Sequence, residues 1–237
     1  CYHGSVDETF ITLDEEGTPM PRANNMGPQI DPRETTKVIE FNDIGALETA
    51  LSARDVAVVL AEPAMTNIGI IHPNEGYHKA LREITRKYGT LLIIDETHTI
   101  CAGPGGYTAS HSLEPDFLTL GKPLAGGVPA AIYGFTEEIS KAFNEKLSLE
   151  DSDVGGIGGT LAGDALSIAA MKATLQNVLT EEFYSKATAL QEKFTEGVQS
   201  VIKEFELPWI VKQLGNRSEY WFRTIVKQLG NRSEYWF

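Results

Sequence analysis

The sequence predicts an α/β fold with a mostly parallel sheet and helices on both of its faces. The first observation behind this prediction is Val56–Leu60, an uninterrupted apolar run of the kind that a strand buried on both faces requires. The second is a helix from Asn74 to Tyr88, in which apolar residues recur every three or four positions. The third is a second apolar run, Leu91–Ile94. A strand, a helix and a strand of these lengths form a parallel βαβ unit.

The segment before this unit is less regular. Residues 1–37 are polar, contain Gly and Pro throughout, and predict an irregular stretch. Val38–Phe41 predicts a short strand. Asn42 or Asp43 can then cap a helix that extends to about Ser52, because either side chain can accept a hydrogen bond from the first helical turn.

The segment after the unit predicts two further strands and three helices. The strands are Phe117–Leu120 and Ala130–Tyr133, and the helices cover about 136–146, 163–178 and 180–205. Thr180 suits the N-cap of the last helix. An apolar stripe follows that helix: Phe183, Ala187, Leu190, Phe194, Val198, Ile202 and Phe205. Pro208 ends the helix, so we expect a large domain over residues 1–205 and the start of a small C-terminal α+β domain over 206–237.

The end of the chain contains a tandem copy. Residues 210–222 recur letter for letter at 225–237. Repeat architectures have longer periods and imperfect copies, so we interpret the second copy as an artefact and assign it no function.

Composition excludes several classes of protein. The 237 residues suit one large domain or two small ones, and 42% hydrophobic with 22% charged residues is ordinary for a soluble globular protein. A net charge of −13 disfavours nucleic-acid and anionic membrane partners. No apolar run is long enough to cross a bilayer, and no signal peptide is predicted. Cys1 and Cys101 form neither a disulfide framework nor a metal-ligand spacing, so we expect a cytoplasmic location and no metal.

Two ionisable residues follow predicted strands directly. Asp95 comes after Leu91–Ile94, and Lys122 lies two residues after Leu120. Ligands bind beyond the carboxyl ends of strands in open parallel sheets. A lysine there can form a Schiff base with an aldehyde cofactor, and a carboxylate can keep a pyridine nitrogen protonated. From placement alone the alternative stays open that Asp95 caps a loop and Lys122 lies on the surface.

The sequence around these residues resembles that of the class III (glutamate-1-semialdehyde aminomutase-like) aminotransferases, which are pyridoxal-phosphate enzymes of fold type I. Asp95–Thr99 resembles the family's Asp-Glu pair, and Leu120–Pro129 resembles its Gly-Lys segment followed by Gly-Gly-x-Pro. Further family-like motifs occur in the same order: Tyr2-His3-Gly4, Glu62-Pro63, Asn67-x-Gly69 and Gly159-Thr160-Leu161-x-Gly163. The resemblance covers about residues 1–205. Within the class, Glu62–Asn67 is similar to the β-amino-acid aminotransferases.

The resemblance implies roles for individual residues. Lys122 would form the Schiff base with pyridoxal 5′-phosphate and move the proton, and Asp95 would pair with the pyridinium nitrogen. Tyr2 would stack on one face of the ring. Thr97, where the family more often has Val, would lie against the other face.

The remaining binding roles are implied in the same way. His3, Glu62 and Asn67 would contribute to the cofactor site near the ring. Thr160 would bind the cofactor phosphate of the neighbouring subunit in a homodimer. Arg217 could bind a substrate carboxylate in two-pronged fashion, and an exposed ion pair is the alternative.

These roles predict an aminotransferase that works in two half-reactions of ping-pong type. An amine or (β-)amino acid would give its nitrogen to the cofactor, and a keto acid or aldehyde would take it up. One alternative is an aminomutase of the glutamate-1-semialdehyde type, which moves the amino group within one molecule. Another is a non-catalytic fragment or binding module without the cofactor. His98, next to this site, suits structural packing and a cofactor contact equally.

Overall fold

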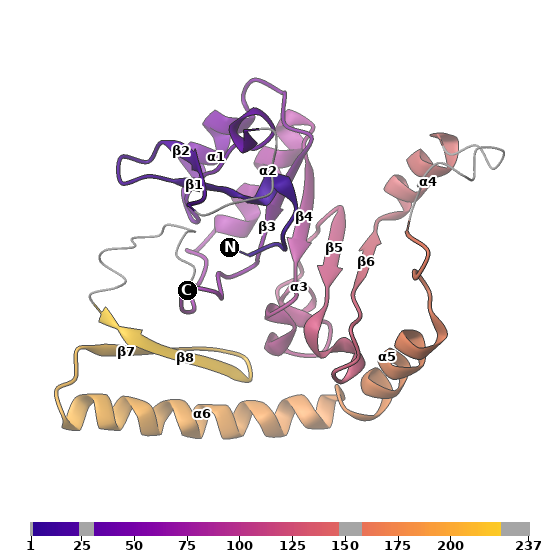
Figure 1. Cartoon of the computed structure of the whole chain (residues 1–237). Helices are drawn as coiled ribbons and strands as arrows, with labels where there is room; N and C mark the ends of the chain where they lie inside the picture. The colour runs from indigo at the N-terminus through magenta and orange to yellow at the C-terminus, as the bar shows by residue number, and fades with distance from the viewer. Residues whose placement is uncertain (1, 24–30, 147–157, 224–237) are drawn as a thin grey trace.

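The computed structural model describes residues 2–23, 31–146 and 158–223. Its centre is a sheet in the order β3-β4-β5-β6 (Figure 1). The strands are β3 (Val58–Ala61), β4 (Leu91–Asp95), β5 (Phe117–Leu120) and β6 (Ile132–Phe135). The first three are parallel and β6 is antiparallel to β5, so the predicted α/β fold with a mostly parallel sheet is confirmed.

The predicted βαβ unit forms as β3, α2 (Tyr77–Tyr88) and β4. Gly89 ends α2 in the left-handed conformation, with φ of +74°. The helix α1 (Ile44–Leu51) packs beside α2, and Asp43 caps it by accepting a hydrogen bond from Ala46 N at 2.8 Å. Together these helices cover one face of the sheet and bury one core cluster: Phe41, Leu47, Leu51, Met65, Tyr77, Leu81, Ile84, Leu92 and Ile94.

Two strand predictions in this half are wrong in detail. Val38–Phe41 forms no strand; Phe41 instead inserts into the core, with its ring centre 4.8 Å from that of Tyr77. The run Val56–Leu60 becomes a strand only from Val58, and Val58 and Leu60 each remain 39% exposed. The reason is that β3 is an edge strand of the described sheet, and α1 and α2 cover only its other face.

The segment 1–37, expected to be irregular, contains a small antiparallel pair of strands. It consists of β1 (Ile11–Leu13) and β2 (Pro19–Pro21), with Ile11 opposite Pro21. In the described part of the chain, the short helical turns are η1 (Asp7–Thr9), η2 (Pro32–Glu34), η3 (Thr99–Ala102), α3 (Gly106–Ser110) and η4 (Lys122–Ala125).

The helices predicted in the second half are present as α4 (Glu137–Lys146), α5 (Ala165–Asn177) and α6 (Glu181–Glu204). Thr180 caps α6, as predicted, by accepting from Phe183 N at 3.2 Å. The hairpin of β7 (Trp209–Leu214) and β8 (Arg217–Phe222) packs along α6 (Figure 1). The first copy of the tandem repeat supplies most of this hairpin, whereas the second copy, 225–237, lies outside the described residues.

The apolar stripe of α6 is only partly buried. Gln191 lies on the hairpin, and its amide donates to Ser218 Oγ at 2.6 Å, whereas the buried Tyr184 donates its hydroxyl to Ile100 O of η3 at 3.0 Å. Several apolar side chains of α6 and its C-cap remain exposed: Phe183, Leu190, Phe194, Val201 and, at the C-cap, Phe205. Across the described ranges, no helix has the length and apolar character that crossing a membrane requires.

Candidate active site

The two predicted reactive residues lie at the carboxyl ends of adjacent parallel strands. Asp95, the last residue of β4, is in register with Thr119 of β5, and Glu96 N donates to Thr119 O at 2.8 Å. The chain then leaves β5 through Gly121. A Cβ atom added to Gly121 would lie 3.9 Å from Thr97 Cγ2, so the loops after β4 and β5 run in contact. The strand-end rule therefore predicted the location of both residues correctly.

Asp95 is a buried carboxylate with two protein donors. His3 Nδ1 lies 2.9 Å from Asp95 Oδ2, and Thr97 N donates to Oδ1 at 2.9 Å. Burial by itself raises the pKa of Asp95, but the hydrogen bonds from His3 and Thr97 outweigh burial and leave this pKa below its usual value. The site therefore holds a fixed negative charge at the end of β4, oriented by a residue 92 positions earlier in the chain.

Lys122 begins η4 in an uncommon backbone conformation. Its φ is +48°, in the left-handed region that residues with a Cβ atom rarely adopt. Its side chain is exposed, and within residues 2–23, 31–146 and 158–223 no hydrogen bond or ion pair of its amine is found. Strained conformations of this kind cluster at functional sites because the surrounding structure must hold them in place.

Glu62 follows β3 and is a second buried acid near Asp95. It is 3% exposed, and it contacts the Thr66 hydroxyl and, at 3.5 Å, the Asn67 amide. Burial raises the pKa of Glu62, and the negative charge of Asp95 acts in the same direction. Two carboxyl groups at neighbouring strand ends thus have pKa values shifted in opposite directions.

His98 connects this acid to the loop after β4. The Thr66 hydroxyl lies 2.7 Å from His98 Nδ1. Burial, together with the positive charges of Arg217 and Lys122, lowers the pKa of His98 to about 4. His98 is therefore a neutral imidazole at neutral pH, within electrostatic range of Lys122.

Arg217 reaches the site from the hairpin at the other end of the chain. Its Nη2 donates to the carbonyl of Thr66 at 3.0 Å and pairs with Glu219. Gly215 allows this approach, because a Cβ atom there would lie 2.1 Å from Cys101 O. Asn216 N donates to the same carbonyl at 3.0 Å, so the turn of the hairpin is anchored on η3.

The structure brings together most of the residues expected at the site. Direct contacts join His3 to Asp95, Asp95 to Thr97, and Glu62 to Asn67. Tyr2 is nearby in sequence but 43% exposed, and Thr160 lies exposed in a separate loop before α5. Sequence reasoning missed Thr66 and Glu219, because neither residue belongs to a recognisable motif. Only the fold places Thr66 beside His98 and Glu219 beside Arg217.

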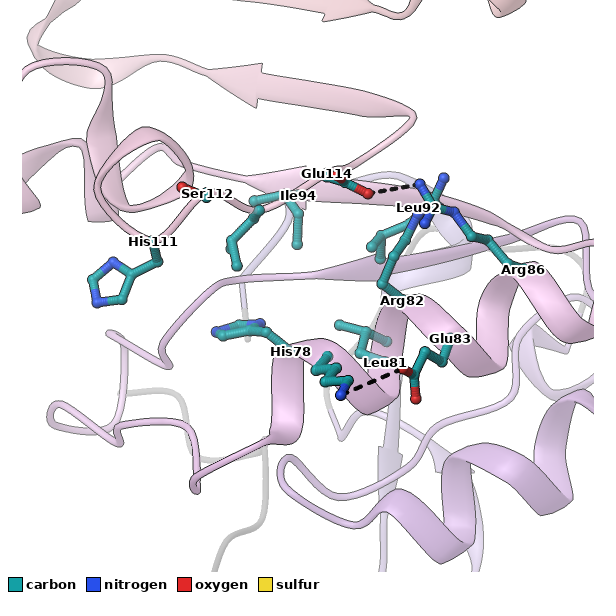
Figure 2. Close-up of a pocket in the computed structure, with 12 residues that line it drawn as sticks. His78, Leu81, Arg82, Glu83, Arg86, Leu92, Ile94, His111, Ser112 and Glu114 are labelled. Carbon is teal, nitrogen blue, oxygen red and sulfur yellow. Dashed lines mark hydrogen bonds and ion pairs between the residues drawn. The ribbon is translucent and has the colours of Figure 1, made fainter.

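A separate pocket of about 320 Å³ lies between α2 and the strand β4 (Figure 2). Its charged side chains are mostly paired with one another: Arg86 with Glu114 at 2.8 Å, and Lys79 with Glu83 at 3.9 Å. Neither Asp95 nor Lys122 lines it. Within the described ranges, no three His, Cys, Asp or Glu side chains gather as a metal site requires.

Comparison with known proteins identifies the family. The profile "Aminotransferase class-III" matches residues 1–217. A glutamate-1-semialdehyde 2,1-aminomutase of Neisseria meningitidis is 31% identical over 227 residues, which is 94% of this chain and 51% of that protein. The chain thus spans about half the length of the curated relatives it matches.

Solved structures agree. A glutamate-1-semialdehyde-aminomutase from Pseudomonas aeruginosa is 46% identical, with a TM-score of 0.88 over 93% of this chain and 50% of that one. A variant of that aminomutase was solved in complex with PMP. An omega-transaminase from Sphaerobacter thermophilus is 29% identical, with a TM-score of 0.75 over 91% of this chain and 50% of its own. The chain therefore belongs to the class III aminotransferases, a family of pyridoxal-phosphate enzymes with fold type I.

Proposed function

We propose that this chain is part of an aminotransferase that moves an amino group from an amine or (β-)amino acid to a keto acid or aldehyde in two half-reactions. The observation that carries this proposal is the pairing of a fixed negative charge with a primary amine. Asp95 is held ionised by His3 and Thr97, and Lys122 lies at the end of the adjacent strand.

The residues present suit pyridoxal phosphate. When bound, this cofactor supplies an aldehyde that condenses with amines and a protonated ring that accepts electron density from the substrate Cα. A buried carboxylate with a lowered pKa, such as Asp95, is the group that would keep the ring nitrogen protonated. Besides Asp95 and Lys122, the residues that would hold the cofactor are Tyr2, His3, Glu62, Asn67 and Thr97, with Thr160 contributed by a neighbouring subunit.

Each residue then has a defined task. His3 and Thr97 orient the Asp95 carboxylate, so that its charge is already in place before the cofactor binds. Lys122 Nζ would carry the proton between the substrate Cα and the C4′ atom of the bound cofactor, as a positioned amine can. The left-handed backbone of Lys122 directs its side chain from the end of β5.

Arg217 is our candidate for the substrate carboxylate. Its guanidinium fork matches a carboxylate in geometry. In the described structure Glu219 occupies part of that fork. Burial raises the pKa of Glu219, although the charge of Arg217 opposes this shift. Burial thus disfavours the ionised form of Glu219, and a substrate carboxylate would compete with this side chain for Arg217.

A second candidate is an aminomutase, which moves the amino group within a single molecule. The names of the curated and structural relatives favour it. Incubating the full-length enzyme with an amine donor and a separate keto acid distinguishes the two activities. Transfer of ¹⁵N from donor to acceptor is expected for the aminotransferase, whereas an aminomutase retains the label in the original molecule.

The lysine assignment has a direct test. Borohydride reduction of the full-length protein with pyridoxal phosphate should attach the cofactor to Lys122, as mass spectrometry of peptides would show. We expect Lys122→Ala to lose both the attachment and the visible absorbance, and Lys172→Ala, an exposed lysine of α5, to keep both. Protein that stays colourless with the cofactor would instead support the non-catalytic alternative.

We further infer a homodimer, because the role proposed for Thr160 requires a neighbouring subunit. The low cysteine content supports a reducing, cytoplasmic site of action. Sedimentation of the full-length protein tests the oligomeric state.

A further inference from the structure

A chain of three side chains joins the buried Glu62 to His98, on which the charge of Lys122 acts. Glu62 contacts the Thr66 hydroxyl, and that hydroxyl lies 2.7 Å from His98 Nδ1. Glu62 is 3% and Thr66 1% exposed, so water does not compete for these hydrogen bonds. The loop that carries Thr66 is held in place by the residue before it. Met65 N donates to Ile71 O at 3.0 Å, and Ile71 N donates to Met65 O at 2.9 Å.

The hydroxyl of Thr66 has only one hydrogen to donate. If Glu62 is protonated, its O–H donates to Thr66, Thr66 donates to His98 Nδ1, and the ring hydrogen sits on Nε2. If Glu62 is ionised, it accepts from Thr66, Thr66 accepts from Nδ1–H, and Nε2 is bare. When the carboxyl proton, if present, lies on Oε2, the oxygen that contacts Thr66, these are the two arrangements that satisfy both hydrogen bonds.

We propose that Glu62, Thr66 and His98 form a proton-coupled chain, in which the protonation state of the Glu62 carboxyl decides which ring nitrogen of His98 carries hydrogen. Switching from the first arrangement to the second moves the Glu62 proton to Thr66 and the Thr66 proton to Nδ1. One proton then leaves from Nε2, so protons balance and no oxidant or reductant is required. Glu62 and Thr66 act through His98, which makes them positioning residues.

The surroundings of the chain favour such a switch. No Lys or Arg lies within ion-pair distance of Glu62 in the described residues, and an unpaired buried carboxyl favours the protonated form. Among the described residues, the ionisable groups that act on Glu62 are His3, Asp95 and Glu219. Those that act on His98 are Arg217 and Lys122, which favour the neutral ring, and Asp95, which opposes them.

The coupling itself does not depend on the reaction, but its use does and rests on the proposed function. A bare Nε2 can accept a proton that is released at the site, and the buried Glu62 supplies a store for it. A substrate carboxylate at Arg217 would also act on this chain, because Arg217 Nη2 donates to the Thr66 carbonyl and its charge bears on His98.

The first test is spectroscopic and needs no substrate. Full-length protein labelled with ¹⁵N-histidine reports the tautomer of each ring by NMR, and infrared difference spectra between wild type and Glu62→Gln report the protonated Glu62 carbonyl. We expect His98 to change tautomer over the same pH range in which the Glu62 band disappears, as two coupled groups should. In Glu62→Gln the His98 tautomer should no longer change over this pH range, because an amide does not titrate.

Variants of Thr66 decide whether the hydroxyl carries the coupling. Thr66→Val preserves shape and removes the hydroxyl, so the His98 tautomer should no longer follow the Glu62 band, whereas Thr66→Ser should restore the link. Thr85→Val is the matched control, since Thr85 is fully buried and its hydroxyl bonds only to the Arg82 carbonyl within α2. A His98 tautomer that is the same in wild type and Thr66→Val at every pH would overturn the proposal.

A second measurement separates this inference from the proposed function. In the active enzyme, Thr66→Val should shift the pH profile of kcat, and Thr66→Ser should return it to that of wild type. A tautomer switch in an enzyme without transaminase activity would refute the function and leave the coupling standing. A normal pH profile of transaminase activity without a tautomer switch would refute the coupling and leave the proposed function standing.

Discussion

At the scale of single residues, the site depends on charges whose protonation the protein sets in opposite directions. Asp95 is kept ionised by two donors, while Glu62, at the end of the adjacent strand, is driven toward its neutral form by burial. Pairs of titratable groups with pKa values shifted apart are typical of sites that hold one charge fixed and move another proton. The roles of Asp95 and His98 can each be tested by a single substitution.

Replacing Asp95 by Asn should reduce kcat about 100-fold or more, because the fixed negative charge opposite the cofactor ring is lost. Steady-state kinetics of the full-length enzyme measure this. Asp116→Asn is a matched control: its side chain is 14% exposed against 12% for Asp95, but it pairs with Arg82 away from the site. The control should lower stability and leave kcat per folded molecule unchanged. Equal kinetic losses in both variants would contradict the role of Asp95.

The lowered pKa of His98 predicts a pH dependence of stability. The pKa is about 4 in the folded chain against an ordinary value of 6.5. Between these values the unfolded chain binds a proton at this position and the folded chain does not. The free energy of unfolding should therefore fall as pH is lowered from 6.5 towards 4.

Urea unfolding of wild type and His98→Asn across this pH range measures the effect. Asn keeps a polar atom near the position of Nδ1 but does not titrate. The slope below pH 6.5 should be shallower in the variant. Parallel curves for the two proteins would mean that His98 titrates normally in the folded state.

At the scale of elements, the hairpin of β7 and β8 is positioned by its turn. Gly215 has φ of +56° and lies against the backbone of η3, while Trp221 packs against Gly69, where an added Cβ would lie 2.7 Å from the indole. These two contacts bring Arg217 to the Thr66 carbonyl, 151 residues away in sequence. The substrate-binding candidate thus depends on the close approach of backbone at glycines.

Replacing Gly215 by Ala should destabilise the chain by about 3 kcal/mol, because it adds left-handed strain to a clash with Cys101 O. Gly89→Ala isolates the strain, since Gly89 has φ of +74° and nothing within 4 Å of the added Cβ. It should cost only about 1 kcal/mol. Denaturant unfolding measures both, and equal losses would show that the contact with η3 contributes nothing.

At the scale of the whole molecule, α6 leaves a continuous row of apolar side chains exposed. It includes Leu190, 70% exposed, and Phe194, 52% exposed. Soluble proteins rarely leave apolar patches of several hundred Å² uncovered. This surface should therefore bind apolar dyes strongly in the 237-residue chain.

Substituting Leu190 and Phe194 together by Lys should reduce the fluorescence of an apolar dye such as ANS on the chain and change the unfolding midpoint little, since both side chains are largely exposed. The control adds the same charges at exposed polar or small positions of α6, with Ala189→Lys and Gln199→Lys. If both double variants bind the dye equally, charge and not the apolar row accounts for the change.

Much of the fold could be predicted because its determinants are local. The apolar runs at β4 and β5, the apolar face of α2, and the caps Asp43 and Thr180 each act within one or two helical turns or one strand, so pattern alone located them. The predictions at Val38–Phe41 and on both faces of β3 were wrong for a different reason. Burial and pairing there depend on which neighbours the chain supplies.

The sequence by itself determined the class of fold, the family resemblance, and the location of Asp95 and Lys122, because strand ends and motif spacing are written in consecutive residues. Only the tertiary structure decided that His3 binds Asp95, that Thr66 lies between Glu62 and His98, and that Arg217 reaches the same loop. These contacts join residues 92, 32 and 151 positions apart. The physical reason is that such contacts form where packed loops meet, and no local pattern encodes that meeting.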